Sequence, residues 1–422
     1  MYIPINGLRR WTPRLVVLLY LLVWQSSAVA QDYISYFRGD EVGPRTFHLD
    51  GEVYINLLSY EQPLESEATW LAKREGYRLA LGSMSGHDLW LEHEIKALAK
   101  VSDRISIRVL AHQGVDIDSS FVFVQPVLEY NLSENHAFIV PTVLDGDKGN
   151  IGGGLGWCYR DPDADLDFLQ LAWLRSNIVF QRSREFEDSK VRSAHDTLEV
   201  QAQGSFFDLG ETSLKIAYLA QGEIRYEELG RDEEYRRFSA WFLHRYNIDA
   251  FNRFFFEFDQ DSAAEQIDPF SPLARTEEFR GERDIGRFRF EYQKDLEEDS
   301  VRRVRGGIQH VRFREDEANP FDLDEEHKID RSEFLFYAGY RCPLGDSETL
   351  SLETVAFLGS MNNHNHFPYD SHEDGTDPSF QGKASFYFHW ALNEDVDFVL
   401  NPSIELDSFG WGGGAIQVRY YF

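Results

Sequence analysis

Residues 286–293 read Gly-Arg-Phe-Arg-Phe-Glu-Tyr-Gln, and from Arg287 to Tyr292 charged and aromatic side chains strictly alternate. A period of two is typical of a β-strand whose two faces meet different surroundings, because successive side chains point to opposite sides. One face would carry Phe288, Phe290 and Tyr292, and the other would carry Arg287, Arg289 and Glu291. The stretch therefore predicts a strand with one aromatic face and one charged face.

The same alternation recurs from about residue 76 onward in segments of roughly ten residues. Helical periodicity over more than two turns is hard to find, and residues 64–75 are the one short stretch that could form a helix. In water, so many aromatic faces would need a partner sheet, whereas in lipid they need none. Further examples of the alternation are residues 104–111, 197–206, 213–221, 252–259, 332–341 and 383–390.

The connections between these segments fall into two classes that alternate along the chain. Short polar turns such as residues 132–135 and 247–249 join strands that must be antiparallel neighbours. Short turns at one end and long loops at the other are typical of a barrel with periplasmic turns and extracellular loops. We therefore predict an all-β fold, a closed antiparallel transmembrane β-barrel of about 18 strands, with roughly 16 to 20 possible. The predicted long acidic loops are residues 184–195, 227–234, 260–282, 315–330 and 359–381.

The N-terminal part of the chain predicts export. Residues 1–30 contain Arg9, Arg10 and Arg14, then the apolar run 15–24, then Ala28-Val29-Ala30. This order predicts a secretory signal peptide cleaved before Gln31, with an uncleaved anchor helix as the alternative. Residues 31–75 fall outside the strand count and could be a periplasmic segment, a plug or an extra strand pair. The barrel is expected to span residues 76–422.

Charge and cysteine content exclude some classes of protein. The chain has 42 basic and 72 acidic residues and a net charge of −30, and no basic stripe offsets the acids. A nucleic-acid partner is therefore not expected. Cys158 and Cys342 are too few for a disulfide framework and lie on well-separated predicted strands, so we expect two free thiols.

The last six residues, Gln-Val-Arg-Tyr-Tyr-Phe, form a strand pattern that ends on an aromatic ring. Ile416, Val418, Tyr420 and Phe422 would share one apolar face. This terminus resembles the C-terminal signature of Gram-negative outer-membrane β-barrels, which the barrel-assembly machinery reads. The resemblance implies an outer-membrane location, with outer-membrane lipid and lipopolysaccharide as surroundings. A soluble β-sandwich is the alternative.

The alternation assigns each strand residue to the lumen or to the membrane. The residues expected to line the pore are Arg104, Arg108, Lys215, Arg237, Arg253, Glu257, Arg287, Arg289, Glu291, Arg303, Arg305, Arg341, Lys383 and Arg419. The residues expected to face lipid are Phe254, Phe256, Phe288, Phe290, Phe334, Phe336, Phe386, Phe388, Tyr420 and Phe422.

The charged inner face admits two interpretations. The arginines could line a water-filled channel, or they could form cross-strand ion pairs that fill and rigidify the lumen. About 18 strands enclose more space than side chains can fill, which favours a channel. Because basic residues outnumber acids among the residues expected to line the pore, we expect a small polar or anionic solute, such as an acidic sugar. The architecture is similar to the alginate-export class of outer-membrane channels.

Two other functions are considered, a non-conducting structural or adhesive barrel and an outer-membrane hydrolase. The sequence has no His-x-Ser strand motif and no Ser/His/acid set whose spacing indicates a triad, so no catalytic residue is predicted. His364, His366 and His372 could bind a metal with nearby carboxylates, but a solvated loop is the simpler interpretation. We therefore predict neither a metal site nor a cofactor.

Overall fold

The described part of the chain forms one all-β sheet. The computed structural model describes residues 75–84, 89–115, 120–145, 151–161, 164–175, 189–193, 196–205, 210–226, 230–270, 279–296, 301–318, 326–345, 349–366, 374–393, 395–406 and 409–421. The predicted signal peptide, residues 31–74 and Phe422 lie outside them. Within these ranges there are nineteen strands, and no helix long and apolar enough to cross a membrane occurs.

The strands follow one another along the chain from β1 to β19. They are β1 Gly76–Met84, β2 Leu89–Lys100, β3 Ile105–Val115, β4 Ser120–Asn131, β5 His136–Asp145, β6 Ile151–Arg160, β7 Phe168–Arg175, β8 Ser189–Ser193, β9 Asp196–Gly204, β10 Glu211–Tyr226, β11 Arg231–Asn247, β12 Asn252–Pro269, β13 Phe279–Asp295, β14 Arg303–Ala318, β15 Glu326–Pro343, β16 Leu350–His366, β17 Asp374–Asn393, β18 Val396–Glu405 and β19 Trp411–Tyr421.

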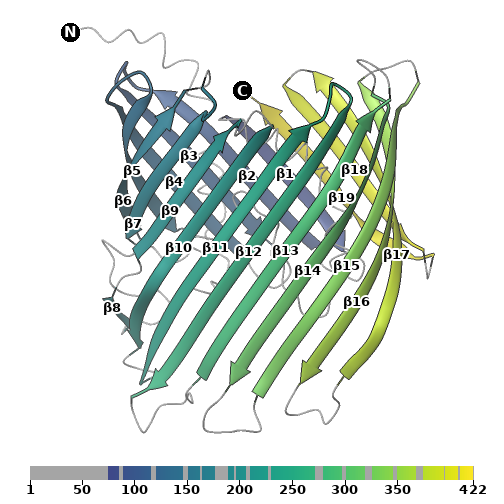
Figure 1. The fold of residues 1–422 in the computed structure, drawn as a ribbon. Helices are drawn as coiled ribbons and strands as arrows, with labels where there is room; N and C mark the ends of the chain where they lie inside the picture. The colour runs from purple at the N-terminus through teal and green to yellow at the C-terminus, as the bar shows by residue number, and fades with distance from the viewer. Residues whose placement is uncertain are drawn as a thin grey trace.

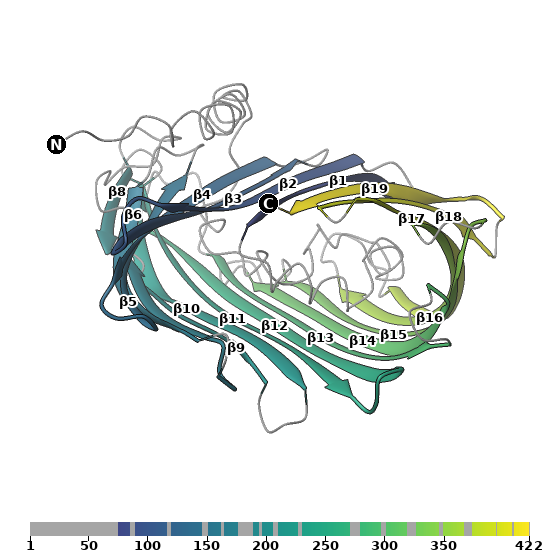
Figure 2. The same ribbon diagram turned by 90° about the horizontal axis from the view of Figure 1, so that it is seen from above.

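The strands close into a ring (Figures 1 and 2). Each pairs antiparallel with its neighbour, β7 pairs with β9, and β19 returns to β1 from Gly76 opposite Tyr421 to Met84 opposite Gly413. β8 and β9 pair with successive parts of the same edge of β10 and share one place in the ring. The described strands therefore make an 18-position closed barrel, which confirms the predicted strand number.

The wall is taller on one side than on the other (Figure 1). β10 to β17 contain 16 to 20 residues each, whereas the other strands contain 5 to 12. About 9–11 tilted residues cross a bilayer, so these long strands continue beyond it by several residues.

This height corrects the predicted loops. β12 runs to Pro269 and β13 begins at Phe279, so the predicted loop 260–282 is mostly strand. The prediction of a long loop there was wrong, and the same holds for residues 315–330, because β14 runs to Ala318 and β15 begins at Glu326. Beyond the bilayer both faces of a strand meet water, so its side chains lose the alternation that reveals a strand. The backbone ladder continues regardless of side-chain polarity.

Prolines interrupt the ladder locally. Between Val124 opposite Leu144 and Val127 opposite Pro141 the pairing of β4 with β5 is broken, but the register is unchanged. The hydroxyl of Thr142 donates a hydrogen bond to the Pro126 carbonyl at 2.9 Å. At Pro402 the register shifts before Ile404, which is a bulge. A proline in a closed wall is thus accommodated by a gap or a bulge, since it cannot donate to the ladder.

The turn between β11 and β12 is held by Asp249. Its Oδ1 accepts hydrogen bonds from the backbone N–H groups of Phe251 and Asn252, both at 2.7 Å, and from the Asn252 side-chain amide at 2.9 Å. These hydrogen bonds, the Asn252 side chain foremost, lower the pKa of the Asp249 carboxyl. Because the folded-state pKa is lowered, this stabilisation is present above the ordinary carboxyl pKa and is lost as the pH falls through the folded-state value.

The closing pair of strands gives a direct test of the ring. Ala80 on β1 lies opposite Gln417 on β19, and both side chains are buried. Opposed residues of antiparallel strands have Cα atoms about 4.5–5.5 Å apart, within disulfide reach. We expect Ala80→Cys with Gln417→Cys, in a chain with Cys158 and Cys342 replaced by Ser, to form a disulfide that non-reducing peptide mass spectrometry detects.

The matched control is Leu81→Cys with Gln417→Cys. Leu81 is the next residue along β1 and points to the opposite face of the wall. This pair is expected not to cross-link in the folded protein. Equal cross-linking of the two pairs would contradict the register of the closure.

Candidate functional site

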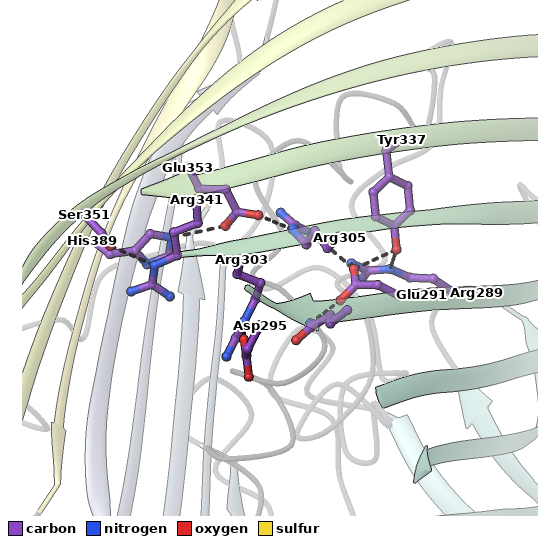
Figure 3. A network of polar contacts seen from close by, with 11 residues as sticks. Arg289, Glu291, Asp295, Arg303, Arg305, Tyr337, Arg341, Ser351, Glu353 and His389 are labelled. Atoms are coloured by element: carbon purple, nitrogen blue, oxygen red, sulfur yellow. Dashed lines mark hydrogen bonds and ion pairs between the residues drawn. The ribbon is translucent and has the colours of Figure 1, made fainter. Parts of the chain in front are cut away.

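The two faces of the wall differ sharply in chemistry. The charged residues Arg289 and Glu291 of β13 lie on one face of the wall and are 1 % and 0 % exposed. The aromatic residues Phe334 and Phe336 of β15 lie on the other face and are 48 % and 58 % exposed. Some contacts of the charged face span two strands, which requires the concave side of a curved sheet. Figure 3 shows these side chains along the inner side of the wall. The charged face is therefore the inner face, and the aromatic face is the outer one.

Tyr337 of β15 reaches across β14 to β13. Its hydroxyl donates a hydrogen bond to Glu291 Oε2 at 2.8 Å and accepts one from Arg289 Nε at 3.2 Å (Figure 3). Gly307 stands between them, opposite both Glu291 and Tyr337. A Cβ at Gly307 would lie 2.5 Å from the Tyr337 ring and hydroxyl. The tyrosine can cross β14 because no side chain occupies this position.

Gly339 of β15 plays the same role one strand further along the wall. Arg305 of β14 lies opposite Gly339 of β15 and forms an ion pair with Glu353 of β16. A Cβ at Gly339 would lie 3.2 Å from Glu353 Oε1. Arg305 Nη1 also lies 3.1 Å from Glu291 Oε2, so one guanidinium joins two buried carboxylates.

These contacts make one continuous network over five strands (Figure 3). It runs from Arg289 and Glu291 through Arg305 to Glu353, and His389 Nε2 of β17 lies 3.5 Å from Glu353 Oε2. Arg341 lies beside it and donates a hydrogen bond from Nε to the Ser351 hydroxyl at 2.8 Å. In this network the Glu291 carboxylate contacts Arg289 and Arg305, and the Arg305 guanidinium also contacts the Glu353 carboxylate.

Most of the other residues expected to line the pore are also buried or paired. Arg287 Nη2 lies 2.9 Å from Glu257, which also accepts a hydrogen bond from Trp241. Lys215, Lys383 and Arg419 are buried in the wall. Arg104 differs, because it is exposed in the turn before β3. The remaining ion pairs join Arg237 to Asp261, both Arg253 and Arg303 to Asp295, and Arg108 to Glu129.

The inner face of β4 to β7 contains an apolar cluster beside its polar residues. Val127, Ala137, Ile139, Cys158, Ala172 and Leu174 are buried together there. Arg108 Nη2 of β3 donates a hydrogen bond to Gln170 Oε1 of β7 at 2.6 Å, so side chains four strands apart meet. The wall bends tightly at this end of the flattened ring (Figure 2). Cys158 and Cys342 are free thiols, as predicted.

Sequence reasoning missed the apolar residues of the inner face. Phe255, Leu335, Val355 and Phe357 are all 0–1 % exposed. Phe255 sits between Phe254 and Phe256, so hydrophobicity alone does not separate it from its lipid-facing neighbours. The odd or even position in the strand does separate them, because Phe255 is two residues from both Arg253 and Glu257 and so shares their face.

On the outer face the aromatic side chains pack across neighbouring strands. The rings of Phe254 and Phe290 are 5.2 Å apart, and those of Phe256 and Phe288 are 5.0 Å apart and edge-to-face. Phe256, like Phe334 and Phe336, is exposed. The other described residues expected to face lipid are half-buried, namely Phe254, Phe288, Phe290, Phe386, Phe388 and Tyr420. Such cross-strand aromatic pairs stabilise a sheet and present an apolar surface.

Within the described ranges, no group of three or more His, Cys, Asp or Glu side chains is placed to hold a metal ion. The sequence allows a metal site at His364, His366 and His372. His372 and the neighbouring Asp370 and Glu373 lie outside the described ranges.

The fold and its two faces define the class of protein. A closed antiparallel ring with an even number of strands, an apolar outer face and a charged inner face is a porin-like outer-membrane β-barrel of Gram-negative type. The ring leaves no free sheet edge, and its aromatic outer face suits hydrocarbon. The protein accordingly resides in the outer membrane.

No protein-family model matches the chain, and no curated protein matches it. Similar solved structures include OccK11 (OpdR) of Pseudomonas aeruginosa, with 14% identity, a TM-score of 0.38 and coverage of 82% of this chain and 95% of that chain. OccAB2 of Acinetobacter baumannii has 13% identity, a TM-score of 0.37 and coverage of 82% and 96%. OprD of Pseudomonas aeruginosa has 8% identity, a TM-score of 0.38 and coverage of 83% and 95%.

The Tyr337 hydroxyl gives a test of the buried network. Tyr337→Phe leaves Glu291 and Arg289 each without one hydrogen bond inside the wall, and we expect a loss of about 1–3 kcal/mol in the free energy of unfolding. The measurement is urea unfolding of the refolded barrel in detergent. Tyr340→Phe is the matched control, since Tyr340 lies on the outer face of the same strand and is exposed. An equal loss in both variants would contradict the role given to the Tyr337 hydroxyl.

Proposed function

We propose that the chain is an outer-membrane channel that passes small polar or anionic solutes through an arginine-lined lumen. The observation that carries the proposal is the charged inner face of a closed ring of 18 strand positions. A ring of this size encloses more space than its own side chains fill. Charge on such a face requires water or paired partners, because isolated buried ions are costly.

Arginine suits this role because one guanidinium carries five N–H donors. A carboxylate of the wall occupies some of them, and the remaining donors can bind a passing anion. Among the ion-paired arginines expected to line the pore, the most accessible side chains are those of Arg108, Arg253 and Arg303, with 26 %, 16 % and 20 % exposure. The neighbouring acids lower the net positive charge, so an anion would be held weakly enough to leave.

A non-conducting structural barrel is the second candidate. Its specific support is the near-complete burial of Arg289, Arg305 and Lys383. A charged side chain that is buried inside the wall need not contact a solute in the lumen. In that case the ion pairs stabilise the wall and the lumen carries no current. No catalytic role is proposed for any residue.

Single-channel recording in a planar bilayer with a salt gradient distinguishes the two candidates. We expect stable open steps with anion preference for the refolded protein. Arg287→Glu with Arg289→Glu replaces two positive charges of the inner face by negative ones, and the reversal potential should shift toward cation preference.

The control variant is Arg312→Glu with Arg314→Glu, which makes the same charge change on exposed residues of β14 outside the lumen. It should leave the reversal potential near that of the unchanged protein. Folding of each variant is checked by heat-modifiable gel migration. A folded barrel that carries no current would support the structural candidate. Equal shifts of the reversal potential in the two variants would show that the inner arginines do not determine ion selectivity.

A further inference from the structure

The apolar outer face of β13 to β15 ends at a definite level. On its outer positions β13 carries Phe290 and Phe288, and β15 carries Phe336 and Phe334. Lys294 near the short-turn end of β13 and Asp284 are ten residues apart, which matches the 9–11 residues that cross a bilayer. The level of Asp284 is therefore the membrane interface opposite the short turns. In outer-membrane barrels that interface belongs to the outer leaflet.

At this level β14 presents two arginines to the outside. Arg312 and Arg314 are both exposed and lie on the same face, two residues apart, or about 6.6 Å along a strand. Among the residues that the structure describes, Arg314 makes no ion pair. Arg312 Nη2 lies 3.5 Å from Asp330 Oδ2, but the two side chains are 60 % and 52 % exposed, so this pair is loose and solvated.

The residues around the two arginines are polar and lie next to the end of the apolar outer face. His310 Nε2 and the Ser332 hydroxyl are 3.1 Å apart, and the His310 ring lies 4.5 Å from the Phe334 ring. Two carboxylates face the site, because Asp284 and Asp330 both lie opposite Arg314 in the ladder. Asp316 follows Arg314 by two residues on the same face of β14, so the two arginines are flanked by acids, with hydrocarbon-compatible surface directly below them.

We propose that Arg312 and Arg314 bind a phosphate group of an outer-leaflet lipid whose acyl chains lie on Ile308, Phe334 and Phe336. Phosphate is the anion that the arginine fork recognises through paired N–H donors. The position favours a lipid phosphate over free phosphate, since the three apolar side chains are exposed immediately on the membrane side of the arginines. Asp284 and Asp330 compete for the guanidinium groups and limit the affinity.

The test uses the full chain in mild detergent and native mass spectrometry, with a bisphosphorylated lipid A as probe. We expect Arg312→Ala with Arg314→Ala to weaken binding about thirtyfold, since each of the two basic residues near an anionic lipid surface contributes about 1 kcal/mol. The control is Arg104→Ala with Arg302→Ala, which removes two exposed arginines near the short turns at the opposite end of the wall. It should bind the probe like the unchanged protein.

Two further measurements test the roles of the competing carboxylate and of the lipid phosphates. Asp330→Asn removes the competing carboxylate and should tighten binding, a change of sign that general loss of folding cannot produce. Lipid A without its phosphates should bind the unchanged protein about as weakly as the bisphosphorylated probe binds the Arg312→Ala, Arg314→Ala variant. Equal loss in the control pair, or full displacement of the probe by an equal concentration of inorganic phosphate, would overturn the assignment.

Discussion

The pairing of β19 with β1 is the contact on which the rest of the structure depends. A sheet edge in hydrocarbon would leave a row of N–H and C=O groups without partners, each at a cost of several kcal/mol. The antiparallel ladder from Gly76 opposite Tyr421 to Met84 opposite Gly413 removes both edges at once. Once the ring is closed, each strand residue has only two directions available, and the chemistry of the two faces can separate completely.

Separation of the faces explains how so many charges are accommodated. On the inner face, the Arg305 guanidinium lies between the Glu291 and Glu353 carboxylates, so that burial of these ions is compensated by neighbours of opposite sign. The spans over two strands depend on Gly307 and Gly339, whose missing side chains let Tyr337 and Arg305 cross. Packing and electrostatics are thus linked, because a small residue on one strand decides which charges on its neighbours can meet.

The two ends of the wall also differ for a physical reason. Near the short turns, hydrogen bonds such as those accepted by Asp249 fix tight connections. At the other end β10 to β17 continue past the bilayer, where strand pairing persists although the side chains no longer alternate. A sequence pattern that depends on lipid on one side and protein on the other cannot report strands beyond the lipid. This is why the predicted loops were too long while the strand number was right.

The all-β class, the approximate number of strands and the face of most residues follow from local patterns in the chain, because parity in a strand is a local property. Runs such as Gly286–Gln293 contain that information without any knowledge of their neighbours. Folding in three dimensions sets which ions pair and brings Arg108 to Gln170 from four strands away. Those outcomes depend on register and on the curvature of the ring, which arise when distant strands come together and leave no trace in a local pattern.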